Sequence, residues 1–203
     1  MKIPIVDNSE YESRIQAYRQ LVSDWNSLTN IISTRAVDNL LTSLSPQSLE
    51  PLNAIFVPKN ARVLDVGSGA GLPALPMKFA RPDLRVTMLE PNRKKWLFLR
   101  RVISELNLEG VEALRGRLED LREEARYRAA FDLITARGTG SALKLAADME
   151  ILVAGGGVCC FFKGKSAAAE AEEIARITNR PIRIHPISRT LHLICVEFSG
   201  RKQ

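Results

Sequence analysis

Residues 62–73 read Arg-Val-Leu-Asp-Val-Gly-Ser-Gly-Ala-Gly-Leu-Pro, and this stretch decides the fold. Its first five residues form a short, mostly apolar run that is typical of a buried strand. The run leads directly into three glycines at alternate positions. Alternating glycines let the backbone turn tightly and approach a ligand without clashes from Cβ atoms. The stretch therefore predicts a strand, a ligand-binding turn and then a helix.

Strand-like and helix-like segments alternate on the C-terminal side of this stretch. Strands are predicted at 85–90, 111–114, 131–136 and 157–162, and helices at about 73–80, 92–107, 141–153 and 166–178. Such alternation predicts right-handed crossovers and a parallel sheet with helices on both faces. The two last predicted strands, 182–184 and 192–198, are separated by too few residues for a helical crossover. We therefore expect an antiparallel hairpin at the C-terminal end of the sheet.

The first 58 residues follow a different pattern. Apolar side chains recur at spacings of three and four from Tyr11 to Trp25, which predicts an amphipathic helix over about 9–28. Two shorter helices are predicted at about 34–44 and 48–56. We therefore divide the chain into an N-terminal helical extension, residues 1–58, and an α/β domain, residues 59–203.

Composition limits the classes of protein to which the chain can belong. The net charge is +6, and the whole of this excess lies after residue 60, which favours a polyanionic partner. The three cysteines lie in apolar stretches at spacings that suit no zinc site, so we expect reduced, buried thiols and no metal. No apolar run reaches the roughly 18 residues of a membrane span, and no apolar core of a signal peptide follows Met1. We expect a cytoplasmic protein, a monomer, with no membrane partner.

The spacing of the glycine loop distinguishes between cofactors. The loop reads G-x-G-x-G, whereas the dinucleotide fingerprint G-x-G-x-x-G would need glycine where Leu72 stands. S-adenosylmethionine has a zwitterionic tail and no phosphate, and Asp65 at the end of the first strand can accept a hydrogen bond from its ammonium group. Glu90 ends the second strand, where a carboxylate can accept from both ribose hydroxyls. The expected loop contacts are Gly67, Ser68, Gly69, Gly71 and Leu72.

Charged side chains end two further predicted strands. Arg137 follows the strand at 131–136 and Lys163 follows the strand at 157–162, so both face the crevice at the carboxyl edge of the sheet. Arg137 can hold a carboxylate or a phosphate in a bidentate fork, and Lys163 can bind phosphate as a point charge. The alternative for both is an ordinary strand-end charge that extends to solvent. We expect positioning roles for them and no general base.

Two other segments carry candidate ligands. Glu119, in the loop after the strand at 111–114, can take the exocyclic amine of adenine, or it is a helix N-terminal acid. Five cations of the predicted helix at 92–107 form a cluster that can hold RNA backbone, or they form a solvated helix face. These cations are Arg93, Lys94, Lys95, Arg100 and Arg101.

Taken together, these motifs resemble those of the ribosomal RNA small subunit methyltransferase G family, also called glucose-inhibited division protein B. The pieces that carry the resemblance are Trp25-Asn26 with Asn30, the glycine loop with Leu72-Pro73, Arg81-Pro82-Asp83, Lys94-Lys95-Trp96-Leu97-Phe98-Leu99, Arg117-Leu118-Glu119, Ala136-Arg137 and Phe162-Lys163-Gly164. They cover about residues 18–165.

The resemblance implies a class I methyltransferase fold, S-adenosylmethionine as cofactor and methylation at N7 of a guanine in 16S ribosomal RNA or the small ribosomal subunit. It also implies cofactor contacts at Gly67, Leu72, Leu118, Glu119 and Arg137. The chain departs from the family before the first strand, where Gln47-Ser48-Leu49-Glu50 replaces a His-x-x-Asp motif. This departure leaves the exact nucleotide open.

Two other functions fit parts of the sequence. A methyltransferase for a small molecule or a protein would use the same cofactor loop, and RNA affinity that falls with salt would distinguish the RNA enzyme from it. A nicotinamide-dependent oxidoreductase would also use a glycine loop, but the loop spacing and the C-terminal hairpin argue against it. Transfer of label from S-adenosylmethionine would exclude the oxidoreductase.

Overall fold

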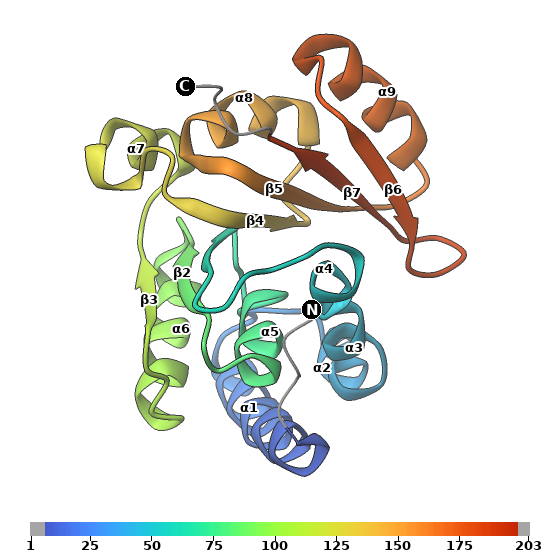
Figure 1. Ribbon diagram of the computed structural model, residues 1–203. Helices are drawn as coiled ribbons and strands as arrows, with labels where there is room; N and C mark the ends of the chain where they lie inside the picture. The colour runs from blue at the N-terminus through green and yellow to red at the C-terminus, as the bar shows by residue number, and fades with distance from the viewer. Residues whose placement is uncertain (1–6, 199–203) are drawn as a thin grey trace.

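The computed structural model describes residues 7–198 and contains one seven-stranded mixed sheet (Figure 1). The strands are β1 (Arg62–Val66), β2 (Arg85–Leu89), β3 (Val111–Leu114), β4 (Phe131–Arg137), β5 (Val153–Lys163), β6 (Ile182–Pro186) and β7 (His192–Glu197). Their order in the sheet is β3-β2-β1-β4-β5-β7-β6. Only β7 runs antiparallel to its neighbours, because the short β6–β7 connection leaves no room for a crossover. The expected parallel sheet with a C-terminal antiparallel hairpin is confirmed.

Helices cover both faces of this sheet. The α-helices are α1 (Asn8–Leu28), α2 (Thr34–Asp38), α3 (Ser45–Ser48), α4 (Glu50–Ala54), α5 (Ala74–Ala80), α6 (Arg93–Glu105), α7 (Leu118–Glu123), α8 (Ala142–Leu152) and α9 (Ala167–Thr178). A π-helical turn, η1 (Leu40–Leu44), and a 3-10 turn, η2 (Ala125–Tyr127), complete the described elements. Within these residues, no helix is long and apolar enough to cross a membrane.

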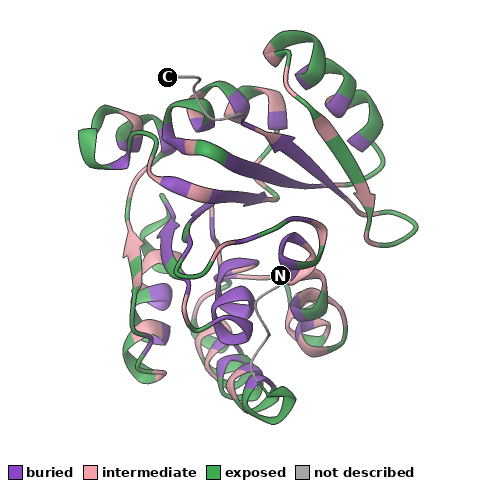
Figure 2. Cartoon of the chain, viewed as in Figure 1, coloured by how far each residue is buried: buried purple, intermediate pink, exposed green. Residues whose placement is uncertain are grey.

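Two apolar layers hold the helices to the sheet. One layer packs α1, α5 and α6 against one face, and the other packs α7, α8 and α9 against the opposite face (Figure 1). Figure 2 shows the buried residues along the strands and on the sides of the helices that face them. Neighbouring residues of β5 alternate between the layers, since Cys160 belongs to the first and Phe161 to the second. This alternation follows from the pleat of a strand that is covered on both faces.

The N-terminal helices share the first apolar layer. Ile15, Tyr18 and Val22 of α1 are at most 1% exposed, and they lie in one cluster with residues of the sheet and α5. The periodic face predicted for α1 is therefore confirmed as a core face. The division of the chain at residue 58 stays a prediction, and residues 1–6 and 199–203 lie outside the described range.

Three details differ from the expected elements. The helix expected at 34–44 is split, because α2 ends at Asp38 and the π-helical turn η1 follows. Strand β5 begins at Val153 rather than near residue 157, and the pairing with β4 shifts register between Phe131 and Leu133. Glu90 lies just after β2 rather than inside it. The cysteines are free and buried as expected.

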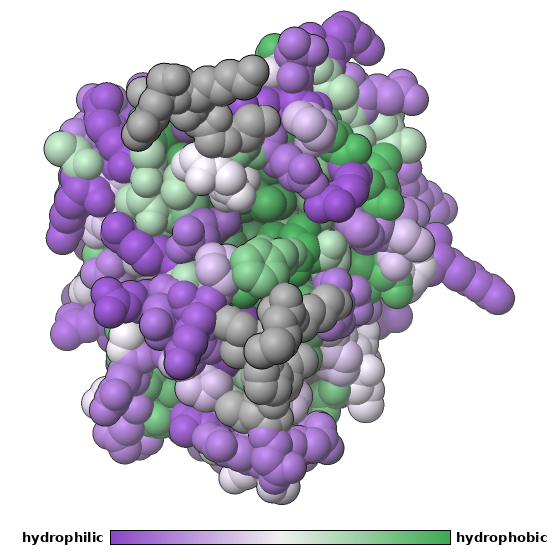
Figure 3. Space-filling model, viewed as in Figure 1, coloured by the Kyte–Doolittle hydropathy of each residue, from purple (hydrophilic) through white to green (hydrophobic). Residues whose placement is uncertain are grey.

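The surface is mainly hydrophilic on the face seen in Figure 3, where polar side chains surround apolar atoms near the centre. Five large apolar side chains are exposed in the described chain, and they lie on separate segments: Leu28, Phe56, Ile151, Ile177 and Ile184. Apolar side chains exposed singly are normal on a soluble protein and mark no interface by themselves.

Candidate active site

The glycine loop turns at the carboxyl end of β1. Gly67, Gly69 and Gly71 have φ values of 69°, 59° and 100°, a region that favours glycine. The N–H groups of Gly67 and Ser68 both donate to the carbonyl of Leu89, at 2.8 and 3.1 Å, which holds the loop against the end of β2. The loop is a series of turns, and the helix α5 begins only at Ala74.

Glu90 fastens this loop from the neighbouring strand. Its Oε2 accepts from the N–H of Gly69 and its Oε1 accepts from the N–H of Asn92, each at 2.8 Å. The side chain is 5% exposed. Each carboxylate oxygen has a second acceptor position, so the contact with ribose hydroxyls expected for Glu90 is compatible with these bonds. Asn92 in turn caps α6 through its side chain.

Asp65 is a buried carboxylate that is only half satisfied. Its Oδ1 accepts from the Thr135 hydroxyl of the adjacent β4 at 2.7 Å, whereas its Oδ2 has no hydrogen-bond partner in the described chain. Burial raises the pKa of Asp65 to about 7, although the hydrogen bond from Thr135 acts to lower it. A buried acceptor without a partner is costly, and this one lies at the expected cofactor site.

Arg137, at the end of β4, is the cationic counterpart of Asp65. Its Nη2 donates to Oε1 of Gln47 at 2.7 Å, and its Nη1 is buried with no partner among residues 7–198. The guanidinium carbon lies 5.1 Å from the ring centroid of Phe162 on β5. Burial lowers the pKa of Arg137, and the negative charge of Asp65 opposes that effect.

These two groups fit the amino-acid tail of S-adenosylmethionine. Asp65 on β1 and Arg137 on β4 influence each other electrostatically, yet no hydrogen bond joins them. An ammonium group can satisfy Oδ2 of Asp65, and an oxyanion can satisfy Nη1 of Arg137. The sequence indicated these two roles, but it did not indicate that each side chain keeps one buried atom without a partner in the described chain, because that follows from the packing of β1 against β4.

Lys163, at the end of β5, is held by contacts with α9 and with the loop that follows β4. Its Nζ donates to the carbonyl of Gly140 and pairs with Oε2 of Glu170 on α9 at 2.9 Å. Glu170 also accepts from the N–H of Ala142 and from the Ser166 hydroxyl. Burial acts to raise the pKa of Glu170, but the bonds from Lys163, Ala142 and Ser166 outweigh it, so the pKa is lowered. Lys163 therefore ties α9 to the loop that follows β4.

The loop that follows β4 lies over Gly67, the first glycine of the cofactor loop. A Cβ atom at Gly67 would lie 2.4 Å from Cγ2 of Thr139, so only glycine permits this approach. Among the other expected contacts, Ser68 is buried and donates to the carbonyl of Asp65, and Leu72 is half-buried.

The segment after β3 holds two expected cofactor contacts, Leu118 and Glu119, which differ in burial. Leu118 is buried in the second apolar layer, whereas Glu119 is exposed at the start of α7. Asp120, which the sequence analysis did not select, accepts from the N–H of Arg117 at 2.7 Å and closes the first turn of α7. The carboxylate of Glu119 is thus free of the capping role, and its contact with adenine stays a prediction.

The basic residues of α6 form a mostly exposed surface. Arg93, Lys94 and Arg100 are exposed, and Arg100 lies 5.1 Å from the ring centroid of Trp96. Lys95 is half-buried and borders an open groove of about 640 Å³ that residues 30–34 also line. The side-chain oxygen of Asn26 fixes the backbone of this segment, because it accepts from the N–H groups of Ile31 and Ile32.

The N-terminal extension contributes two site residues that the sequence analysis missed. The Tyr18 hydroxyl of α1 donates to the carbonyl of Ala70 in the glycine loop at 2.7 Å, and Gln47 of α3 accepts from Arg137. The apolar spacing of α1 indicated that Tyr18 is buried, and a buried hydroxyl needs a partner. No local signal indicated which residue that partner is.

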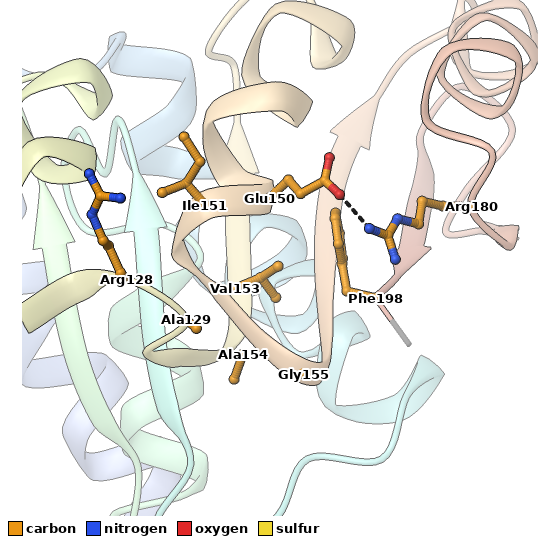
Figure 4. A pocket seen from close by; sticks show the side chains of 9 residues that line it. All are labelled: Arg128, Ala129, Glu150, Ile151, Val153, Ala154, Gly155, Arg180 and Phe198. Carbon is orange, nitrogen blue, oxygen red and sulfur yellow. Dashed lines mark hydrogen bonds and ion pairs between the residues drawn. The ribbon is translucent and has the colours of Figure 1, made fainter. Parts of the chain in front are cut away.

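Another cavity, of about 610 Å³, lies away from these groups, where β4 and β5 begin (Figure 4). It is lined by Arg128, Ala129, Glu150, Ile151, Val153, Ala154, Gly155, Arg180 and Phe198. Arg180 points toward Glu150 and forms an ion pair with it, and its guanidinium carbon lies 5.0 Å from the ring centroid of Phe198. None of the expected site residues lines this cavity.

Comparison with known proteins decides the family. The family described as rRNA small subunit methyltransferase G matches residues 11–180. The chain belongs to this family. A ribosomal RNA small subunit methyltransferase G from Moorella thermoacetica is 35% identical over 82% of this chain and 70% of its own length. One from Streptococcus equi subsp. zooepidemicus is 35% identical over 62% of this chain and 54% of its own length. The match thus spans about half of the second relative.

Solved structures agree with the fold. A SAM-dependent methyltransferase from Aquifex aeolicus superposes with a TM-score of 0.65 at 14% identity, over 82% of this chain and 99% of its own. A precorrin methyltransferase from Geobacter metallireducens has a TM-score of 0.60 at 15% identity, over 84% and 92% of the two chains. The class I methyltransferase fold and the enzyme class expected from the sequence are confirmed.

Proposed function

We propose that this enzyme transfers a methyl group from S-adenosylmethionine to N7 of a guanine in 16S ribosomal RNA. One observation carries the cofactor assignment. Oδ2 of Asp65, an acceptor, and Nη1 of Arg137, a donor, are buried without a partner among residues 7–198, and they lie beside a glycine loop. The names of the relatives support ribosomal RNA of the small subunit as the substrate.

The reaction needs alignment more than proton transfer. The cofactor supplies an electrophilic methyl group, and N7 of guanine carries an in-plane lone pair and no proton, so no general base is required. Holding two reactants in line can be worth an effective molarity of about 10⁵–10⁸ M. In this proposal, Asp65 holds the ammonium group of the tail and Glu90 holds the ribose, while Arg137 binds either the carboxylate of the tail or a phosphate of the RNA. The remaining cofactor contacts are Gly67, Ser68, Gly69, Gly71, Leu72, Leu118 and Glu119.

The test of the function uses the chemistry of N7. Purified protein is incubated with tritiated cofactor and either small ribosomal subunits or a 16S transcript. We expect label in the RNA, and strand cleavage by aniline after borohydride reduction at the modified guanine. A transcript in which 7-deazaguanosine replaces guanosine has no N7, so it should accept no label. Label in this control, or label only in protein or a small molecule, would contradict the proposal.

The RNA is proposed to lie on the basic side chains of α6, and a phosphate that binds at Lys163 would have to compete with its ion pair to Glu170. Arg93, Lys94 and Arg100 are exposed and none of them has an acidic partner in the described chain, whereas Arg101 pairs with Glu105 at 3.3 Å. Lys95 borders the adjoining groove. Unpaired cations release counterions when they bind phosphates, which makes the affinity depend on salt.

Reversal of charge on α6 should therefore weaken the binding of RNA whatever its nucleotide sequence. For the double variant Lys94→Glu and Lys95→Glu, we expect a lower RNA affinity and a salt dependence reduced by about one unit of slope per lost phosphate contact. Filter binding across a salt series measures both. Cofactor affinity serves as the control and should not change. An unaltered salt slope would place the RNA on another surface.

Cytoplasmic location and a monomeric state are part of the same proposal. Ribosomal RNA is a cytoplasmic substrate in bacteria, which supports the location. The scattered positions of the exposed apolar side chains, on five separate segments, support the monomer.

A further inference from the structure

Gln47 connects the N-terminal extension to the active site. It lies on α3, 90 residues before Arg137, and its Oε1 accepts from Nη2 of Arg137 at 2.7 Å. Its Nε2 donates to the Ser43 hydroxyl of the π-helical turn η1 at 2.9 Å. Gln47 is half-buried, so this link lies between the helices and the sheet.

The chemistry of the two partners determines the orientation of the Gln47 amide. A guanidinium has donors only, so the amide oxygen must face Arg137 and the amide nitrogen must face Ser43. The serine hydroxyl can accept from that nitrogen. Ser43 therefore holds the amide in the one orientation that binds the arginine.

This contact leaves one amino group of Arg137 available. Nη2 donates to Gln47 and the guanidinium lies over the Phe162 ring, while Nη1 is buried and has no partner in the part of the chain that the structure describes. Because Gln47 is neutral, the contact satisfies Nη2 without cancelling the positive charge. A carboxylate in the same place would form an ion pair with Arg137 and weaken its attraction for any other anion.

We propose that Gln47 is a positioning residue, which holds Arg137 so that Nη1 binds an oxyanion of a reactant at full charge. The inference rests on the proposed function, because it concerns the same site. Two reactants carry such an oxyanion, namely the carboxylate of the cofactor tail and a phosphate of the RNA. The experiment distinguishes between them.

The main variant is Gln47→Glu, which keeps the shape and the acceptor and adds a negative charge. A second variant, Gln47→Leu, removes the acceptor. The control is Gln16→Glu, which makes the same charge change at an exposed position of α1. Thermal unfolding of all three shows whether the fold is retained.

Two binding measurements and one kinetic measurement follow. Calorimetry gives Kd for S-adenosylmethionine and for 5′-methylthioadenosine, which lacks the amino-acid tail. Methyl transfer to small subunits gives kcat, and KM for the RNA. Loss of one charge-assisted hydrogen bond corresponds to about 10-fold to 100-fold in affinity.

Either of two results supports the inference. A Kd that rises by that factor for S-adenosylmethionine in Gln47→Glu, but not for 5′-methylthioadenosine, assigns the oxyanion to the cofactor carboxylate. An unchanged Kd with a KM for RNA that rises by that factor assigns it to a phosphate. Well-folded Gln47→Glu and Gln47→Leu proteins that match Gln16→Glu in all three measurements would overturn it. If the wild-type protein binds the cofactor but methylates no RNA, the proposed function fails, and the cofactor measurements still test Gln47.

Discussion

Asp65→Asn is expected to weaken the binding of S-adenosylmethionine about 10-fold to 100-fold at pH 8. The variant keeps an oxygen for the Thr135 hydroxyl, but it places an amide N–H₂ at the position of Oδ2, which has no partner among residues 7–198. A donor at that position faces the ammonium group and cannot accept from it. Isothermal titration of wild type and variant with the cofactor measures the effect.

A matched control is the substitution of another aspartate, Asp132, which lies where β4 begins. Asp132 stands near the start of β4, and its Oδ2 accepts from the N–H of Arg62 at 2.7 Å. Asp132→Asn removes the same charge at the opposite end of β4 from Arg137 and should leave the cofactor Kd unchanged. Equal affinities for Asp65→Asn and wild type would show that the ammonium does not bind at Asp65.

The raised pKa of Asp65 also gives both stability and binding a dependence on pH. The pKa in the folded protein is about 7, above its ordinary value of 3.8. Between these two values the folded state keeps a proton that the unfolded chain has lost, so the contribution of Asp65 to stability falls as pH rises. This fall is at most roughly 4 kcal/mol, and it is complete above about pH 7.

Cofactor binding should show the opposite trend. An ammonium group favours the ionised carboxylate, so binding below pH 7 should release a proton and the affinity should rise as pH increases through about 7. Titration at pH 6 in buffers of different ionisation enthalpy counts that proton. Asp65→Asn should show neither the proton release on binding nor the decrease in stability as pH rises. If the variant kept both effects, they would belong to another group.

Arg81→Ala is expected to lower the free energy of unfolding by about 3–5 kcal/mol, because it leaves part of a buried ion pair unpaired. Arg81 is 4% exposed and donates to both carboxylate oxygens of Asp83, at 2.6 and 2.7 Å. It also donates to the carbonyls of Val57 and Pro58 in the segment that joins the extension to β1. The hydrogen bond from Arg81 is the main cause that lowers the pKa of Asp83 to about 2.

Urea denaturation at pH 7 measures this loss, with Arg14→Ala as the control. Arg14 pairs with Glu10 at 3.2 Å on the exposed face of α1, where such a pair contributes only about 0.3–0.5 kcal/mol. Since the pKa of Asp83 is lowered by folding, its contribution is present above about pH 4 and is lost as pH falls toward 2. A loss for Arg81→Ala no larger than that for Arg14→Ala would show that the pair is not structural.

The sequence alone determined the features that arise from neighbouring residues. The run before Gly67 predicted β1, because a buried parallel strand is a short apolar segment. The brief connection between β6 and β7 predicted their antiparallel pairing, since no crossover fits within it. The spacing of the glycine loop distinguished the cofactor, because backbone geometry there depends on which positions are glycine. These expectations needed no knowledge of what packs against what.

Only the tertiary structure decided which polar atoms meet. The order of the sheet places β4 beside β1, so that Asp65 and Arg137 influence each other electrostatically, and each keeps one buried atom without a partner among the described residues. The same packing brings Gln47 to Arg137 and the Tyr18 hydroxyl to the glycine loop, across 90 and 52 residues of chain. Hydrogen bonds over such separations leave no periodic pattern in a sequence, because they depend on where whole elements pack rather than on the spacing of residues along one element.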